Sequence, residues 1–234
     1  MYNNGLTKLS KVDLGLTAYK EAWELQKKLV NLRWQGKVTD LLLLTEHEPV
    51  ITMGRAAYDS NLLIPKTELK KLNIGLYQVE RGGDVTFHGP GQVLAYPIID
   101  LNNRGRDLHK YLRDLEAVVM DVLEQLGLPA NTRRGMTGVW VNNHKLAAIG
   151  VAVSQWVTYH GLALNVETDL DYFKLINPCG ITQFPVGSVS SMLGKKVKAK
   201  QVAHMLAASF VRLFGYETET SVDISELLEE DAVV

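Results

Sequence analysis

Apolar positions in the first part of the chain follow two different periods. From about residue 14 to residue 34 they recur every three or four positions, with lysines and glutamates on much of the other side, which predicts an amphipathic helix. The four leucines at 41–44 form a short continuous run instead, which is typical of a buried strand. Residues 49–55 are expected to end this unit in a loop, and the weak alternation over 73–80 predicts a further strand.

Most of the remaining predicted strands follow one another in the middle of the chain. Residues 93–99 predict a strand in which Pro97 indicates an edge position, because proline cannot donate to a sheet ladder. Three strand-like pieces follow, at 138–141, 145–153 and 158–166. The glycines at 150 and 161 either let the backbone approach a ligand closely or mark bulges.

Two later helices complete the pattern. Apolar residues keep a 3–4 spacing from Tyr111 to Leu126, with Asp107 as the expected N-cap and Gly127 as the expected end. Another helix is predicted over 200–214, and the acidic end, about 221–234, is expected either to add a short amphipathic helix or to be disordered. Mixed helices and hairpin-like strands predict an α+β fold rather than a regular βαβ series, in a single domain over residues 1–234.

Composition removes several classes of function. One cysteine in 234 residues excludes an internal disulfide framework and any multi-cysteine zinc or iron–sulfur site. Lys and Arg total 25 against 26 Asp and Glu, so no global field favours nucleic acid or an anionic membrane. No apolar run approaches the roughly 18 residues of a spanning helix, and the first residues lack the apolar core of a secretory signal. We therefore expect a cytoplasmic protein.

The glycine-rich segment RGGDVTFHGPGQ, residues 81–92, has two interpretations. Gly82 and Gly83 permit a backbone that exposes N–H groups to a ligand, and Pro90-Gly91 suits the centre of a type II turn. The segment is either a substrate cradle or a pair of tight turns between strands. It does not match GxxxxGK[ST], which excludes a P-loop.

Cys179 and Lys145 are the candidates for covalent chemistry. Cys179 stands between Pro178 and Gly180, a stiff bend that suits a nucleophile, although a lone cysteine is more often a small buried apolar residue. Lys145 opens an apolar strand, so its ammonium either reaches solvent or meets a partner. An ammonium within 4–6 Å typically lowers the pKa of a titrating group by about 1–3 units, enough to make most of a thiol thiolate at pH 7.

Other polar residues give weaker signals. The histidines show neither HExxH nor HxH spacing, so no metal site is predicted, and no GxSxG predicts a serine nucleophile. His88 and His160 either orient a substrate carbonyl or satisfy a turn through a backbone hydrogen bond. The basic run 195–200 and Arg133-Arg134 are either solvated faces or docking points for an acidic protein.

Taken in order, the motifs resemble one family. These are EHEPVITMGR (46–55), RGGDVTFHGPGQ (81–92), TGVWV (137–141), KLAAIGVAV (145–153), HGLALNV (160–166) and PCGI (178–181). The sequence resembles lipoyl(octanoyl) transferases of the LipB type over about residues 14–213. The resemblance implies the fold of the biotin/lipoate protein ligase catalytic domain, in which a larger mixed sheet flanked by helices carries a smaller subdomain.

The resemblance also implies roles for individual residues. Cys179 corresponds to the acyl-thioester nucleophile and Lys145 to the lysine that lowers its pKa. The implied acyl pocket comprises Arg81, Gly82, Gly83, Asp84, Val85, Thr86, Phe87, His88, Ala148, Ile149, Gly150, Gly161, Leu162 and Ala163. Many members carry glutamine where this chain has Asp84, which leaves the role of that position open.

The implied activity is transfer of an octanoyl group, in lipoate biosynthesis, without a cofactor or metal. The donor is octanoyl-acyl carrier protein, and the acceptors are lysines on lipoyl domains of 2-oxoacid dehydrogenase complexes and on the glycine cleavage H protein. Neither nucleic acid nor a membrane is an expected partner. One alternative is an ATP-dependent lipoate or biotin ligase of the same fold, although the GRGRxG-type loop of biotin ligases is absent. Another is a catalytically silent protein that binds lipoyl domains or acyl carriers.

Overall fold

The strands of the chain form two sheets. The computed structural model describes residues 8–177 and 185–229. The larger sheet is ordered β11 (Thr218–Ser221), β1 (Lys8–Thr17), β2 (Asp40–His47), β6 (Gln92–Ile98), β10 (Val157–Asn165), β9 (His144–Ser154), β8 (Met136–Val141) and β7 (Asn131–Arg133). It is mixed, because β1 runs parallel to both β11 and β2 whereas the pairs from β2 to β7 are antiparallel. The α+β prediction is thus confirmed.

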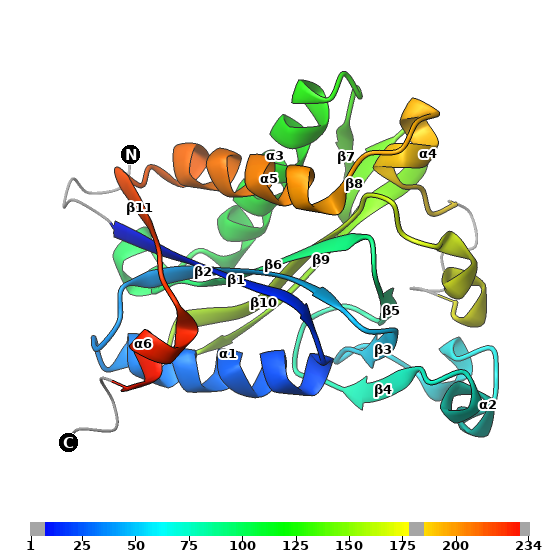
Figure 1. Ribbon diagram of the computed structural model, residues 1–234, viewed down its shortest axis with the longest axis horizontal. Helices are drawn as coiled ribbons and strands as arrows, with labels where there is room; N and C mark the ends of the chain where they lie inside the picture. The colour runs from blue at the N-terminus through cyan, green and yellow to red at the C-terminus, as the bar shows by residue number, and fades with distance from the viewer. Residues whose placement is uncertain (1–7, 178–184, 230–234) are drawn as a thin grey trace.

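Helices cover both faces of the large sheet (Figure 1). One face carries α1 (Tyr19–Trp34) and α6 (Ile224–Glu229), and the other carries α3 (Leu108–Gln125) and α5 (Ala199–Phe214). The leucines of β2 show why both faces are apolar. Leu41 and Leu43 pack with α1, whereas Leu42 and Leu44 pack with α3 and α5. Because side chains alternate along a strand, a continuous apolar run is needed where both faces are buried.

The first helix begins later than its apolar spacing predicts. It starts at Tyr19, and residues 14–17 belong instead to β1. A bulge between Asp13 and Leu16 carries Gly15 with φ of 60°. Such a bulge shifts the alternation of inward- and outward-facing side chains by one position. The end of β1 therefore lacks the regular alternation that would have predicted a strand there.

Pro97 lies in a central strand, contrary to the edge position predicted for it. Strand β6 is between β2 and β10, and Pro97 pairs with Leu42. The register of Leu162 with Ala95 sets His160 opposite Pro97. His160 has φ of 55° and its N–H donates to Gln26 Oε1 at 2.8 Å, so β10 departs from a regular ladder beside the proline. That departure is what lets a central strand accept it.

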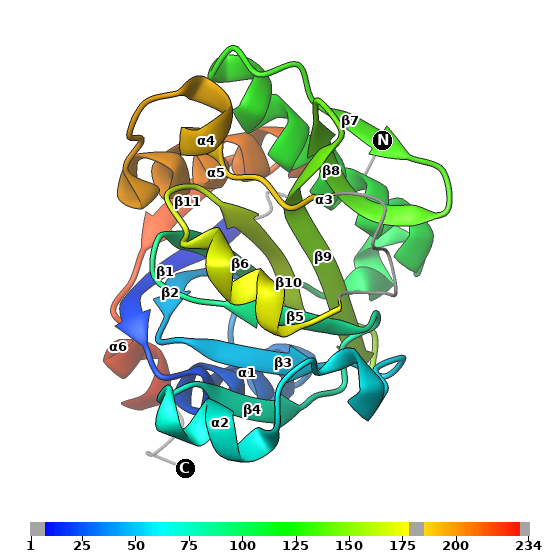
Figure 2. The same cartoon turned by 90° about the vertical axis from the view of Figure 1, so that its right-hand side faces the viewer.

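The smaller sheet contains strands that the sequence did not predict. Its order is β4 (Gly75–Gln78), β3 (Val50–Met53) and β5 (Val85–His88), and it lies beside α2 (Lys66–Lys71), as Figure 2 shows. Strands β3 and β5 fall in segments expected to be loops. A strand of four residues is too short to show a clear alternation of apolar and polar positions when glycines flank it. This sheet has its own apolar cluster with the turn η3 (Leu170–Leu175), which forms the expected smaller subdomain.

The other predicted elements agree closely with the structure. Asp107 caps α3 by accepting a hydrogen bond from the Lys110 amide at 2.8 Å, and β8, β9, β10 and α5 each begin and end within two residues of prediction. The short elements η1 (Asp59–Asn61), η2 (Leu101–Arg104) and α4 (Val189–Leu193) complete the described chain. None of the helices in the described ranges has the length and apolar character to cross a membrane.

Candidate active site

A cavity of about 430 Å³ opens where the two sheets meet. Strands β5, β6, β9 and β10 supply much of its wall, and Leu108 and Leu112 of α3 and Met136 of β8 contribute to it. Among the described residues, the lining includes Lys145 and almost the whole predicted acyl pocket: Arg81, Gly82, Gly83, Asp84, Val85, Thr86, His88, Ala148, Ile149, Gly150, Gly161, Leu162 and Ala163. Residues from three distant parts of the sequence are therefore brought to one cavity.

Phe87 is the member of the predicted pocket that does not line the cavity. It is buried in the apolar cluster of the smaller sheet, where its ring stacks on Tyr172 with centroids 4.6 Å apart. Its neighbours Thr86 and His88 line the cavity. Because successive side chains of β5 point to opposite faces, Phe87 supports the wall from behind.

Bare glycines let the glycine-rich segment pack against the large sheet. The Gly82 amide donates to the Val151 carbonyl at 2.9 Å. A Cβ on Gly150 would lie 2.8 Å from the Gly82 carbonyl oxygen, and one on Gly54 would collide with the Gly83 carbonyl oxygen. The close approach at Gly150 is thus made by the protein's own backbone, as is the one between Gly161 and Ala95.

The predicted turn at the end of this segment is present. The Gln92 amide donates to the Gly89 carbonyl at 3.2 Å, and Gly91 has φ of 79°, as the second central residue of a type II turn requires. Glycine-rich turns and cavity lining therefore coexist in one segment. The turn interpretation of residues 81–92 is confirmed at its end, and the substrate cradle stays a prediction that the cavity lining is compatible with.

Arg81 is a buried cation in the cavity wall. Its Nη2 donates to the carbonyl and to the hydroxyl of Thr52, at 2.7 and 2.9 Å. The side chain is directed by β3, since Thr52 pairs with Thr86 across the smaller sheet. Arg81 therefore adds positive potential to the histidine-lined part of the cavity.

The histidines at the cavity are held neutral. Burial, with smaller contributions from the nearby His47 and Arg81, lowers the pKa of His88 to about 3. Burial, with Arg81 again contributing, lowers the pKa of His160 to about 4. His88 Nδ1 lies 2.7 Å from Gln92 Oε1, so its partner is a side chain rather than the backbone of a turn.

Lys145 is the second residue of β9 and is half-buried in the wall. Its Nζ lies 5.3 Å from the centroid of the Trp140 ring. Its backbone is paired with the chain beyond it: the Lys145 amide donates to the Pro185 carbonyl at 2.9 Å, and the Lys145 carbonyl accepts from the Gly187 amide at 3.0 Å. These two hydrogen bonds fix the position of the Lys145 backbone relative to residues 185–187.

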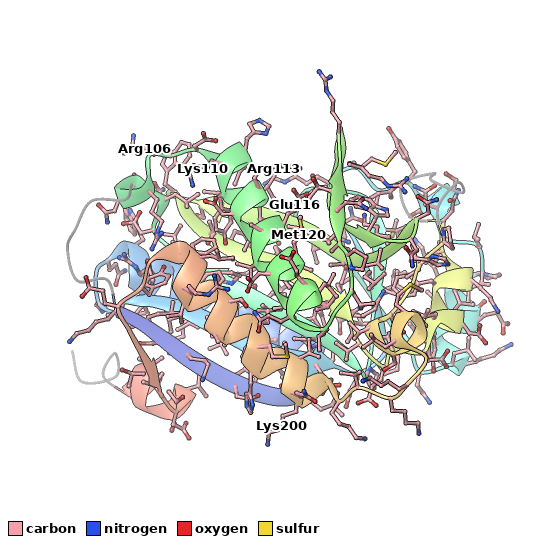
Figure 3. All side chains as sticks on the ribbon, turned by 90° about the horizontal axis from the view of Figure 1, so that it is seen from above. Arg106, Lys110, Arg113, Glu116, Met120 and Lys200 are labelled. Atoms are coloured by element: carbon pink, nitrogen blue, oxygen red, sulfur yellow. The ribbon has the colours of Figure 1, made fainter. Side chains whose placement is uncertain are left out.

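A buried carboxyl group lies near this lysine. Glu116 of α3 accepts a hydrogen bond from the Gly138 amide at 2.9 Å and forms an ion pair with Arg113 at 2.6 Å; Figure 3 labels both side chains on α3. Burial raises the pKa of Glu116, and the Gly138 N–H, Arg113 and Lys145 partly offset that rise. The Lys145 charge thus acts on a buried carboxyl group of α3.

Cys179 lies outside the described residues, so its predicted proximity to Lys145 stays a prediction. The described chain stops at Asn177 and resumes at Pro185. The Asn177 amide donates to the Asn61 carbonyl at 2.7 Å, and residues 185–187 pair with Lys145. The flank after the cysteine segment is therefore held by Lys145 of the candidate site, and the flank before it is held by Asn61.

The sequence reasoning missed several residues of the site. Gln92 and Asn165 line the cavity and form hydrogen bonds with each other, and Tyr19 and Tyr96 contribute aromatic walls. A signal was available for Asn165, a polar residue directly after the apolar run 162–164 of β10. Gln92 stood at the end of the glycine-rich segment, but nothing in that pattern assigned it a partner.

Comparisons with known proteins identify the family of the chain. The model of the lipoyl protein ligase A/B catalytic domain matches residues 18–211. An octanoyltransferase of Rubrobacter xylanophilus is 48% identical over 203 residues, covering 86% of this chain and 91% of that protein. One of Desulforamulus reducens is 42% identical over 213 residues, covering 91% of this chain and 93% of that protein.

Solved structures show the fold. A lipoate-protein ligase A bound with ATP has a TM-score of 0.75 at 18% identity, covering 94% of this chain and 91% of that one. The biotin protein ligase of Aquifex aeolicus has a TM-score of 0.51 at 11% identity, covering 90% of this chain and 70% of that one. The fold expected from the motifs is confirmed. With its catalytic domain and its close relatives identified in this way, the chain belongs to the octanoyltransferase family.

Proposed function

We propose that this protein transfers an octanoyl group from octanoyl-acyl carrier protein to a lysine of a lipoyl domain, in the cytoplasm, through a thioester on Cys179. The observation that carries the proposal is the position of Lys145. It lies in the wall of a largely apolar cavity, and its backbone is hydrogen-bonded to Pro185 and Gly187, which follow the cysteine segment. The acceptors would include the lipoyl domains of 2-oxoacid dehydrogenase complexes and the glycine cleavage H protein.

The cavity suits an acyl chain. Its volume of about 430 Å³ lies within the range of small-molecule sites, and aliphatic residues of β6, β9 and β10 line it. Asn177, the last described residue before the cysteine segment, stands two positions before Cys179 in the sequence. Asn177 is bonded to Asn61, which in turn is bonded to Asp84 of the cavity wall. The residue two positions before Cys179 is therefore connected to the cavity wall through Asn61, which supports the proposal.

In the first half-reaction the Cys179 thiolate attacks the thioester carbonyl of the donor. The new C–S bond forms as the bond to the phosphopantetheine sulfur breaks, and the leaving thiolate takes a proton from the Lys145 ammonium. One thioester replaces another, so the step is nearly neutral in free energy. The ammonium favours the thiolate beforehand and supplies the proton afterwards.

In the second half-reaction the ε-amine of the acceptor lysine attacks the acyl-enzyme. Neutral Lys145 accepts the proton that this amine loses, the C–S bond breaks, and the Cys179 thiolate is regenerated as an amide forms. Amide formation from a thioester is downhill, so no nucleotide is consumed. His88 and His160, neutral because burial depresses their pKa values, act in the cavity as hydrogen-bonding groups rather than as cations.

Mass spectrometry tests the proposal directly. Mixing the protein with octanoyl-acyl carrier protein, without acceptor, is expected to add one octanoyl group to Cys179, and hydroxylamine is expected to remove it. Addition of a lipoyl domain should discharge the adduct and octanoylate one lysine. The matched control is Cys179→Ser, which removes the thiol with little change in volume.

Two results would contradict the proposal. One is a Cys179→Ser variant that transfers octanoate at the rate of the unmodified protein. The other is transfer that starts from free octanoate, requires ATP and releases AMP, which is the reaction of a ligase.

A further inference from the structure

We propose that Asp84 and Asn165 are positioning residues of the transfer reaction: through Asn61 and Gly187, their side chains hold the two flanks of the cysteine segment against the glycine-rich segment. The inference rests on the proposed function for its consequence, and on described contacts for its geometry.

The flank before the cysteine is held through Asp84. This side chain is 9% exposed, and both of its carboxylate oxygens are used. Oδ1 accepts from the Val85 amide and Oδ2 accepts from Asn61 Nδ2, each at 2.6 Å. The Asn61 carbonyl then accepts the Asn177 amide at 2.7 Å. One carboxylate therefore joins the start of β5 to the residue two positions before Cys179.

The same flank is aligned by backbone pairing. Leu62 and Ile176 form an antiparallel bridge, and the Leu63 amide donates to the Leu175 carbonyl at 2.9 Å. This pairing aligns residues 175–177 with residues 61–63. The bond from Asn61 to Asp84 then connects this pair of segments to the start of β5.

The flank after the cysteine is held through Asn165. Its Oδ1 accepts from Gln92 Nε2 at 2.7 Å, and its Nδ2 donates to the Gly187 carbonyl at 3.0 Å. Gln92 is in turn bonded to His88, and the Gly187 amide donates to the Lys145 carbonyl. These bonds are buried, and a Cβ on Gly187 would lie 2.8 Å from the Cβ of His144, so this part of the chain has little room to shift.

The two contacts share a consequence for reactivity. A nucleophile and a proton carrier must meet the donor carbonyl together, and a misplacement of about 1 Å can cost about 100-fold in rate. Asp84 and Asn165 touch neither reacting group in this scheme. They act by setting the positions of Asn177 and Gly187, so their loss is expected to lower the rate of acylation more than the affinity for the donor.

A donor–acceptor exchange tests the first contact. Asp84→Asn leaves one side-chain oxygen for two donors, the Val85 N–H and Asn61 Nδ2. Asn61→Asp places two carboxylates together, and each variant is expected to slow single-turnover acylation by about 10–100-fold. The double variant, Asp84→Asn with Asn61→Asp, restores one donor and one acceptor and is expected to recover the rate to within about threefold of the original. Asp59→Ala, which removes an exposed carboxylate from the same turn, is the control and should leave the rate unchanged.

For the second contact the matched variant is Asn165→Asp. It keeps the acceptor for Gln92 but replaces the donor to Gly187 with an oxygen, so acylation should slow by about 10–100-fold while KM for the donor changes by less than about threefold. The pH dependence of alkylation of Cys179 by iodoacetamide, which needs no acyl donor, should shift in Asn165→Asp and in Asp84→Asn and return to the original in the double variant.

These outcomes separate this inference from the proposed function. Unchanged acylation and alkylation in folded Asp84→Asn and Asn165→Asp proteins would overturn it, as would a folded double variant that fails to recover. Absence of an octanoyl adduct on Cys179 in the unmodified protein contradicts the proposed function instead, and the alkylation measurements then still report whether the two contacts position the cysteine.

Discussion

The Gly187 amide donates a hydrogen bond of 3.0 Å to the carbonyl of Lys145. Together with the bond from the Lys145 amide to the Pro185 carbonyl, it makes a short parallel bridge centred on Val186. The lysine proposed to carry protons is thus fixed, by its own backbone, to the chain that leads away from the proposed nucleophile. Substitution of the lysine side chain leaves that connection intact, so its chemistry is separable from its structural role.

Lys145→Ala is expected to lower the transfer rate by about 10²–10⁴-fold, the usual range for loss of general acid–base catalysis. Lys145→Arg keeps the positive charge, so alkylation of Cys179 at pH 7 should stay within a few-fold of the original. Transfer should still fall, because a guanidinium does not release its proton near neutral pH. Single-turnover transfer and alkylation rates, measured on the same samples, check both statements. Full activity in the arginine variant would rule out proton transfer by this residue.

Gly138→Ala is expected to disturb the Lys145 side chain. An added Cβ would lie 2.7 Å from Lys145 Cε and 2.6 Å from the Ala147 carbonyl oxygen, and Gly138 has φ of 144°. We expect kcat to fall at least about tenfold, since the lysine must move aside. Gly127→Ala serves as control: it also has positive φ, but nothing lies within 4 Å of its added Cβ, so it should cost only about 1 kcal/mol of stability. Equal kcat in the two variants would contradict the prediction.

Ala148→Leu should shift the preference toward shorter acyl chains. Ala148 lines the cavity and pairs with Ala163, which lines it as well, so the larger side chain occupies space proposed for the octanoyl group. We expect kcat/KM for octanoyl donors to fall about tenfold or more, with a smaller loss for butanoyl donors, since extra methylene groups in a filled pocket each cost binding energy.

The matched variant for that experiment is Ala152→Leu. Ala152 is on the same strand and pairs with Tyr159, but it belongs to the apolar cluster between the large sheet and α1. It should lower stability by about 1–3 kcal/mol, as overpacking does, without changing the ratio of octanoyl to butanoyl transfer. A similar change of that ratio in both variants would indicate general loosening instead of a filled cavity.

Stability is expected to fall as the pH drops below about 6.5. Burial lowers the pKa of His47 to about 4, of His88 to about 3 and of His160 to about 4, so the unfolded chain binds protons before the folded one does. Each group leaves stability unaffected above its unfolded pKa and reduces it by up to about 1.4 kcal/mol per pH unit between its unfolded and folded values. Glu116 works in the opposite direction, because burial raises its pKa and the folded state gains its proton first.

Urea unfolding between pH 7.5 and pH 4.5 measures this trend. His47→Gln removes one of the three groups, and its stability should fall less steeply with decreasing pH than that of the original protein. The His47 ring is 2.8 Å from the Thr17 carbonyl and 2.7 Å from the Tyr96 hydroxyl, so the variant will be less stable at pH 7.5. The slope, rather than the absolute free energy, is the decisive quantity, and an unchanged slope would show that His47 does not titrate in this way.

Long periodic segments were determined by the sequence itself. The 3–4 spacing and the Asp107 cap determined α3, and the four leucines of β2 determined a strand buried on both faces. Such patterns are reliable because burial of one helical face, or of both strand faces, requires them whatever the neighbours are. The ordered motifs likewise identified the residues of a cavity wall, with Phe87 excepted, since nothing in a motif tells on which side of a strand a side chain points.

The remaining features depend on contacts between distant residues. Whether Pro97 stands at an edge was decided by β10, which departs from a regular ladder at His160, opposite the proline. Strands β3 and β5 are too short to be recognised from the sequence pattern, and their pairing with each other stabilises them as strands. Asp84 meets Asn61, 23 positions earlier, and Asn165 meets Gly187, 22 positions later. A hydrogen bond needs its two atoms about 3 Å apart, and only the folded chain sets that distance between residues so far apart in sequence.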